Sequence, residues 1–279
     1  DAEALLSQYG PFLRPEDIAQ GRVPTALFGC YTNALTLFTI VPAMTQAFGI
    51  SALPNVTAAW AGGSRVKLEH SVENVLRISA LVTMPAGLAL SVLADPIARL
   101  LGYNPISGRI LVLLGLGAVF AAVNVPINSM LQAVGRIDLP VKLLCTGLVI
   151  KVGLNYVLTG IPEINVMGTG VGTLVCYFFL AFFGLAALGR ETGLHMRLFR
   201  LFGKPLLCAC LAAAAGWQTA ALAHRLWPGR LEALPAMAVF LLVYGICVLL
   251  FRVLRRSDIN ALPGGEKIAK ILEKHRWIG

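Results

Sequence analysis

Seven long apolar stretches, with lysines and arginines collected in alternate gaps between them, restrict this chain to a membrane. Six of the stretches carry no charged residue: 23–64, 78–94, 110–135, 164–189, 205–223 and 233–251. The seventh, about 139–161, is interrupted only by Lys142 and Lys151. A helix needs roughly 20 apolar residues to cross about 30 Å of hydrocarbon. The pattern therefore predicts an all-α fold, a polytopic membrane helix bundle of about seven transmembrane helices.

The first stretch is long enough for two helices, so the distribution of cations has to decide its topology. If it forms one long, bent span, most lysines and arginines fall in gaps on one side of the membrane. The other side then carries Arg14, Arg22, Arg99, Arg109, Arg225 and Arg230. Positive charge is concentrated in cytoplasmic loops. We therefore expect a multi-pass protein of the inner (cytoplasmic) membrane whose chain starts outside and ends in the cytoplasm.

The formal net charge of +9 follows from the same arrangement. A cation at the cytoplasmic membrane edge gains about 1 kcal/mol near anionic lipid, so anionic membrane lipids are expected partners. The basic residues are spread over separate loops and form no single face, which argues against nucleic acid.

Nothing in the chain predicts an enzyme, a metal site or a cofactor. The six cysteines all lie in apolar stretches, without metal-ligand spacing, and are expected to be small core residues. No GxSxG, HExxH or phosphate-loop motif is present, and the four histidines lack acidic or serine partners at useful spacing.

The chain divides into four parts. Residues 1–22 are expected to be the end of a helix whose beginning is absent, followed by an outer loop. Residues 23–225 form a bundle of six spans, 226–256 an extra span, and 257–279 an amphipathic tail on the cytoplasmic surface. An odd number of spans, an outside start and the absence of an initial Met suggest that further spans precede Asp1 in the natural protein.

A transporter must enclose a wet path, so polar residues at helical spacing within a span are candidates for its lining. In the first span these residues are Thr32, Thr36, Thr39 and Gln46, which share one helix face. Pro42 and Pro54 remove backbone hydrogen bonds nearby, so we expect this helix to bend. The face is either a cavity wall or a row of hydroxyls bonded back to their own helix.

Other spans carry further candidates. Asn124 and Asn128 lie one above the other in the third span, either as contacts between helices or as cavity lining. Lys151 lies near the middle of the fourth span, where a lysine costs about 2.5–3.5 kcal/mol, and Asn155 follows one turn later. Lys151 either holds helices together through a carbonyl or faces a cavity, where it would attract an anionic headgroup.

Two further patterns concern packing and depth. The fifth span opens with a small-residue pattern that predicts close helix packing: Gly168, Thr169, Gly172 and Thr173. Arg77 and Asp95, at the two ends of the second uncharged run, are expected at the membrane interface.

Residues 24–59, 128–144, 151–179 and 203–207, taken in order, resemble the second half of a known transporter family. It is the polysaccharide-export and stage V sporulation protein B branch of the multidrug/oligosaccharidyl-lipid/polysaccharide (MOP) flippase superfamily. The resemblance implies two lobes of six helices around a central cavity, with two extra C-terminal helices. This chain would then be the second lobe, lacking an N-terminal lobe, and Asn55 would join the lining of the first span.

The function that the resemblance implies is a flippase that moves lipid-linked oligosaccharide or polysaccharide precursors of the polyprenyl pyrophosphate type for cell-envelope biosynthesis. Such a charged headgroup cannot cross hydrocarbon unaided. A cation-coupled multidrug efflux transporter of the same superfamily is an alternative, although it would be expected to place an acid deep in a span, where this chain has Lys151. A non-transporting membrane scaffold is a third possibility.

Overall fold

The computed structural model describes residues 2–161, 163–194, 198–226, 229–251 and 253. Within these ranges every regular element is a helix, and seven helices are long and apolar enough to cross a membrane. The predicted all-α membrane bundle is therefore confirmed. The expected cytoplasmic tail, 257–279, lies outside the described residues.

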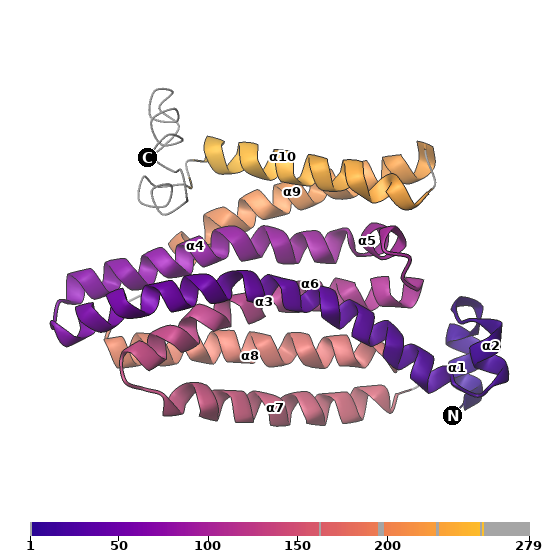
Figure 1. Ribbon diagram of the computed structural model, residues 1–279, viewed down its shortest axis with the longest axis horizontal. Coiled ribbons are helices and arrows are strands. Elements are labelled where there is room, and N and C mark those ends of the chain that lie inside the picture. Colours follow the sequence, from indigo (N-terminus) through magenta and orange to yellow (C-terminus); the bar gives the residue numbers. More distant parts are fainter. Residues whose placement is uncertain (1, 162, 195–197, 227–228, 252, 254–279) are drawn as a thin grey trace.

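The long helices are α3 (Val23–Ala61), α4 (Arg65–Val92), α6 (Pro105–Ala133), α7 (Asp138–Thr159), α8 (Met167–Thr192), α9 (Leu198–Leu226) and α10 (Ala233–Leu250). The short ones are α1 (Ala2–Tyr9), η1 (Gly10–Phe12), α2 (Pro15–Ala19), α5 (Ala94–Leu100) and η2 (Arg230–Glu232). The first apolar stretch forms the single helix α3, as the cation distribution predicted. Pro42 and Pro54 lie inside the helix, and its ribbon is curved (Figure 1).

The second long helix is longer than the uncharged run that predicted it. The second long helix begins at Arg65, well before the uncharged run at 78, because its charged first turns continue the same helix. Arg77 therefore lies near the middle of α4 instead of at its end, and it is buried. Its guanidinium donates a hydrogen bond to Asn74 Oδ1 at 3.2 Å, which reduces the cost of holding a cation inside the bundle.

The helices lie in layers (Figure 1). α7 runs along one edge, α8 lies next to it, α6 and α3 occupy the middle with α4, and α9 and α10 form the opposite edge. α6 is the central helix, because it packs against α3, α4 and α8. Its many small residues let those neighbours approach it from several sides.

Close helix crossings depend on glycine. At the crossing of α4 and α6, a Cβ on Gly115 would lie 2.5 Å from the Ser91 nitrogen, and one on Gly87 would lie 2.8 Å from the Gly115 oxygen. Between α7 and α8, a Cβ on Gly168 would lie 2.7 Å from Leu158 Cβ, and one on Gly172 would overlap the Asn155 side chain. The small-residue packing predicted for the fifth span is therefore confirmed.

The N-terminal segment folds back onto the end of the bundle where α6 begins. Tyr9 and Leu13 are buried, and the Arg109 guanidinium lies 4.8 Å from the centre of the Phe12 ring. Burial raises the pKa of the Tyr9 hydroxyl, partly offset by the nearby Arg109 charge. Asn104 links the N-terminal segment to the start of α6. Its Oδ1 accepts a hydrogen bond from the Ile106 N–H at 2.9 Å, and its Nδ2 donates to the Phe12 carbonyl.

The two bonds of Asn104 can be separated by substitution. Asn104→Asp keeps the oxygen that caps α6 but loses the donor to Phe12, whereas Asn104→Ala loses both. We expect the free energy of unfolding to fall by about 1 kcal/mol for Asp and about 2 kcal/mol for Ala. Thermal unfolding in detergent would measure both values; no loss for Asp would show that the bond to Phe12 contributes nothing, and equal losses would show that the cap contributes nothing.

Candidate functional site

The polar stripe on α3 faces away from the rest of the described structure. Thr32, Thr36, Thr39 and Gln46 are all exposed. The opposite face of α3 carries the buried residues Ala34, Phe38 and Val41, which belong to the main apolar core. The side of α3 that the sequence marked as a cavity wall is thus free of contacts with the chain's own bundle.

The threonine hydroxyls on this face are bonded to their own helix. Thr32 Oγ1 donates to the Phe28 carbonyl and Thr36 Oγ1 to the Thr32 carbonyl, both at 3.0 Å, and Thr39 Oγ1 donates to the Thr36 carbonyl at 2.7 Å. The hydroxyl protons are therefore used, while the oxygen lone pairs still point outward as acceptors. The stripe can therefore be both a row of hydroxyls bonded to their own helix and a cavity wall, because the bonded hydroxyls still offer oxygen acceptors.

Asn55 does not share this stripe. It is exposed on α3 but follows Gln46 by about two and a half helical turns, which puts it on the other side of the helix. The lining that the resemblance implies stays a prediction, with Asn55 apart from the four residues that share one face, Thr32, Thr36, Thr39 and Gln46.

The polar residues of α6 pass from the interior to the surface. Asn124 is buried and faces α8, where a Cβ on Gly184 would lie 3.5 Å from Asn124 Oδ1. Asn128 is half-buried, and Gln132 is exposed near the end of the helix. Asn124 therefore contributes to the contact between α6 and α8, while Asn128 reaches the edge of that contact.

Lys151 and Asn155 lie at the seam between α7 and α8, and both are half-buried. Asn155 Oδ1 is buried beside Gly172 and accepts no hydrogen bond in the part of the chain that the structure describes. Lys151 precedes it by one turn on a neighbouring part of the same face. An ammonium donor and a carboxamide acceptor thus lie within one turn of each other in the seam.

The structure does not bring Lys151 to the threonine stripe. α3 packs on α6, α6 on α8, and α8 on α7, so two helices separate the lysine from α3 (Figure 1). The candidates form two regions, the outward face of α3 and the seam of α7 with α8, with the asparagines of α6 on the helix between them.

The sequence did not predict two hydroxyls, one fully buried and one half-buried, that bond carbonyls freed by helix prolines. Pro126 has no N–H, so the Ala122 carbonyl one turn earlier lacks its helical donor. Thr45 Oγ1, fully buried on α3, lies 3.0 Å from that carbonyl oxygen. Pro85 frees the Leu81 carbonyl in the same way, and the Tyr244 hydroxyl of α10 donates to it at 2.6 Å. The signal in the sequence is a proline inside a span, but the partner is far away along the chain.

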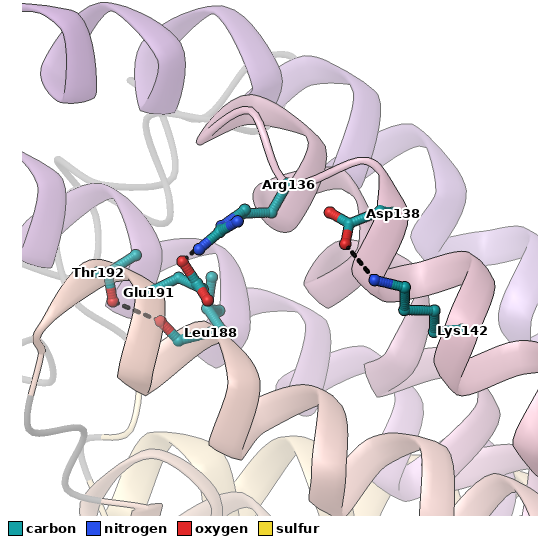
Figure 2. Close-up of polar contacts among 6 residues, drawn as sticks. All are labelled: Arg136, Asp138, Lys142, Leu188, Glu191 and Thr192. Carbon is teal, nitrogen blue, oxygen red and sulfur yellow. Dashed lines mark hydrogen bonds and ion pairs between the residues drawn. The ribbon is translucent and has the colours of Figure 1, made fainter.

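The turns α3–α4 and α6–α7 meet the C-terminal end of α8 at one end of the bundle. Figure 2 shows Arg136 Nε bonded to Glu191 Oε2 at 2.6 Å, and Lys142 Nζ bonded to Asp138 Oδ2 at 2.8 Å. The Glu191 carboxylate raises the pKa of Arg136 by hydrogen bonding and by its charge. Arg65 donates to the carbonyl of Gly193, the left-handed residue that ends α8. Two arginines from different turns thus hold the same helix end.

At the other end of the bundle, one buried acid joins three elements. Glu232, which precedes α10, accepts from Arg99 of α5, and its Oε2 lies 2.8 Å from Nδ1 of His224 on α9. The Glu232 side chain is almost fully buried, while its two partners are about half exposed. This contact fixes the connection between α9 and α10 against α5.

Comparisons with known proteins agree with this architecture. The family model described as MatE matches residues 21–157, from the start of α3 almost to the end of α7. The uncharacterized membrane protein YabM of Bacillus subtilis is 21% identical over 266 residues, which cover 91% of this chain and 48% of YabM. An uncharacterized membrane protein of Methanocaldococcus jannaschii is 25% identical over 142 residues, covering 49% of this chain and 27% of that protein.

A solved structure shows the same fold. The inward closed conformation of the lipid II flippase MurJ superposes with a TM-score of 0.62 at 16% sequence identity, over 81% of this chain and 47% of MurJ. The chain thus spans about half the length of MurJ and of YabM. The chain therefore matches the MatE family model over residues 21–157 and shares the fold of MurJ.

Proposed function

We propose that this chain forms one lobe of a flippase that moves lipid-linked oligosaccharide or polysaccharide precursors across the cytoplasmic membrane, in the polysaccharide-export and stage V sporulation protein B branch of the superfamily. The observation that carries the proposal is the outward polar face of α3, with Thr32, Thr36, Thr39 and Gln46 all exposed. A second support is the solved structure MurJ, which has the same fold and is named as a lipid II flippase.

The chemistry of this face suits a saccharide. Polar groups that face hydrocarbon are costly, so the stripe needs water or a polar cargo beside it. Because the threonine protons are taken by α3 itself, the stripe presents oxygen acceptors. Sugar hydroxyls supply matching donors, whereas an aromatic drug cation would find no carboxylate there.

The charges within the described helices favour an anionic cargo. Arg77 and Lys151 lie near the middle of α4 and α7. The acidic residues of the described long helices, such as Glu73 and Glu191, lie within about three turns of a helix end. A pyrophosphate headgroup would be stabilised by such cations, whereas the acid that lies furthest into a long helix in this part of the chain, Glu73, is one turn before Arg77 and closer to the start of α4.

A central path needs a second wall. Since the chain spans about half of MurJ, we propose that the α3 stripe faces a second lobe supplied by the natural protein, and that the two lobes rock about the cargo. The cytoplasmic side would be the end that holds Arg65 and Arg136, near anionic lipid. An inside-negative potential would then favour outward movement of an anion by about 2.3 kcal/mol per charge per 100 mV.

A substrate assay tests this function. The natural protein, reconstituted in proteoliposomes, should move a fluorescent polyprenyl-pyrophosphate saccharide between leaflets faster than empty vesicles do, and should not accumulate a cationic dye under a proton or sodium gradient. Accumulation of the dye without saccharide movement would establish efflux instead. Movement of neither probe would favour the scaffold.

A further inference from the structure

Three contacting helices of the bundle each carry an interior proline: Pro42 in α3, Pro85 in α4 and Pro126 in α6. An interior proline lacks the N–H of the helical ladder and leaves the carbonyl one turn earlier without its donor. Sharp helix kinks occur at such residues.

Pro42 of α3 and Pro126 of α6 lie about two turns apart along two contacting helices. Thr45, one turn after Pro42, lies 3.0 Å from the Ala122 carbonyl that Pro126 frees. A Cβ on Gly49 would lie 3.5 Å from Pro126 Cα, so the two helices are in contact along this whole turn.

The kink of α4 lies at the same level. Met84, next to Pro85, lines one cavity together with Val119 and Val123 of α6. Gly87, half a turn further along α4, approaches the Gly115 carbonyl of α6. All three helices are therefore interrupted within one section of the bundle about two helical turns long, which is the proline level.

The freed carbonyls at this level are held by hydroxyls from neighbouring helices. Tyr244 of α10 donates to the Leu81 carbonyl of α4 at 2.6 Å. Thr45 Oγ1 lies 3.0 Å from the Ala122 oxygen and 2.9 Å from the Pro42 oxygen of its own helix. Since a threonine has one hydroxyl proton, Thr45 can release Ala122 and keep its bond to Pro42, so it remains satisfied in either arrangement.

Room for movement lies beside these contacts. The cavity that Met84, Val119 and Val123 line has a volume of about 220 Å³ and extends to Phe178 of α8 and Phe202 of α9. Protein interiors are close-packed and resist displacement, so open space beside Met84 of α4 and Val119 and Val123 of α6 permits these side chains to repack when the two helices bend.

We propose that Pro42, Pro85 and Pro126 form one hinge level across α3, α4 and α6, closed by the Thr45 and Tyr244 hydroxyls. Release of these two hydrogen bonds lets the parts of the helices on either side of the level change their angle. The Tyr244 bond also couples the bend of α4 to the position of α10. The proposed hinge does not depend on which cargo is moved.

A double-mutant cycle tests the Tyr244 contact in the natural protein. Tyr244→Phe leaves the Leu81 carbonyl without a donor and should lower the midpoint of thermal unfolding by about 2–4 °C. In a Pro85→Ala background the alanine N–H can bond Leu81, so the same substitution should cost less than half as much. Tyr156→Phe is the matched control, because Tyr156 is 84% exposed on α7 and should change nothing.

Bending is measured separately by spin labels at Lys67 and Leu101, which are exposed on either side of Pro85. The exposed native cysteines, Cys145 and Cys210, are replaced by serine for this purpose. Tyr244→Phe should broaden the distance distribution between the labels, and Pro85→Ala should narrow it. Additive midpoint shifts in the cycle, or a distribution that Tyr244→Phe leaves unchanged, would overturn the hinge without bearing on which cargo is moved.

Discussion

Replacing Thr32, Thr36 and Thr39 together by valine should slow the movement of lipid-linked saccharide by about tenfold or more. Each hydroxyl that accepts a hydrogen bond from the cargo contributes about 0.5–1.5 kcal/mol, and 1.4 kcal/mol corresponds to a factor of ten. Valine keeps the shape of threonine, and these side chains make no hydrogen bond to another helix in the described structure. We therefore expect little change in the midpoint of thermal unfolding.

The matched control is Thr146→Val with Thr219→Val. Thr146 donates to the Lys142 carbonyl on α7 and Thr219 to the Ala215 carbonyl on α9, the same local bond that Thr32 and Thr36 make on α3. This pair should leave flipping in proteoliposomes unchanged. If the α3 variant moves the saccharide at the normal rate while remaining folded, the stripe does not line the path.

Replacing Lys151 by methionine should change stability and transport in opposite directions. A lysine near the middle of a span costs about 2.5–3.5 kcal/mol on insertion scales, and methionine keeps most of its length without the charge. Because Lys151 is only half-buried, we expect the free energy of unfolding to rise by about 1–2 kcal/mol. Movement of an anionic lipid-linked cargo should fall by about tenfold if the headgroup contacts the seam of α7 with α8 in addition to the α3 stripe, since a cation that attracts it is lost.

The direction of the stability change separates the two roles of this lysine. If Lys151 only holds α7 to α8 through Asn155 or a carbonyl, methionine should lower stability and transport together. Lys151→Arg keeps the charge and is the conservative control, which should retain most of the transport. Unfolding midpoints and proteoliposome flipping rates, measured on the same preparations, decide between these outcomes.

Several features of the site could be read from the sequence because they are local. The step from Thr32 to Thr36 to Thr39 gives one face for any α-helix, and that face is indeed continuous. Gly168 and Gly172 predicted close packing because a missing side chain allows close approach. Asn55 is exposed as well, but it lies nine residues after Gln46, about half a turn away around the helix, so its place in the lining rests on the resemblance alone.

Other features depend on contacts between distant parts of the chain. The burial of Arg77 depends on α4 starting before its uncharged run and packing on α6 and α9. The sequence of α4 does not indicate which hydroxyl will donate a hydrogen bond to the carbonyl that its proline leaves without a donor. Tyr244 and Leu81 are 163 positions apart, and Thr45 and Ala122 are 77 apart.

The sequence by itself determined that this chain forms membrane helices, how many spans it has, and which helix faces are polar. A span and its polar face are set by the hydrocarbon thickness and by the helical period, and both involve only about twenty neighbouring residues. These properties can therefore be predicted from a short segment of sequence. Only the tertiary structure decided that the α3 stripe faces away from its own bundle, that Lys151 lies two helices from it, and that three proline kinks meet at one level. Those outcomes depend on which helix packs against which. Lipid tails are as apolar as the helix faces, so the hydrophobic effect does not determine the helix partners in a membrane. Close packing and interhelical hydrogen bonds determine them instead.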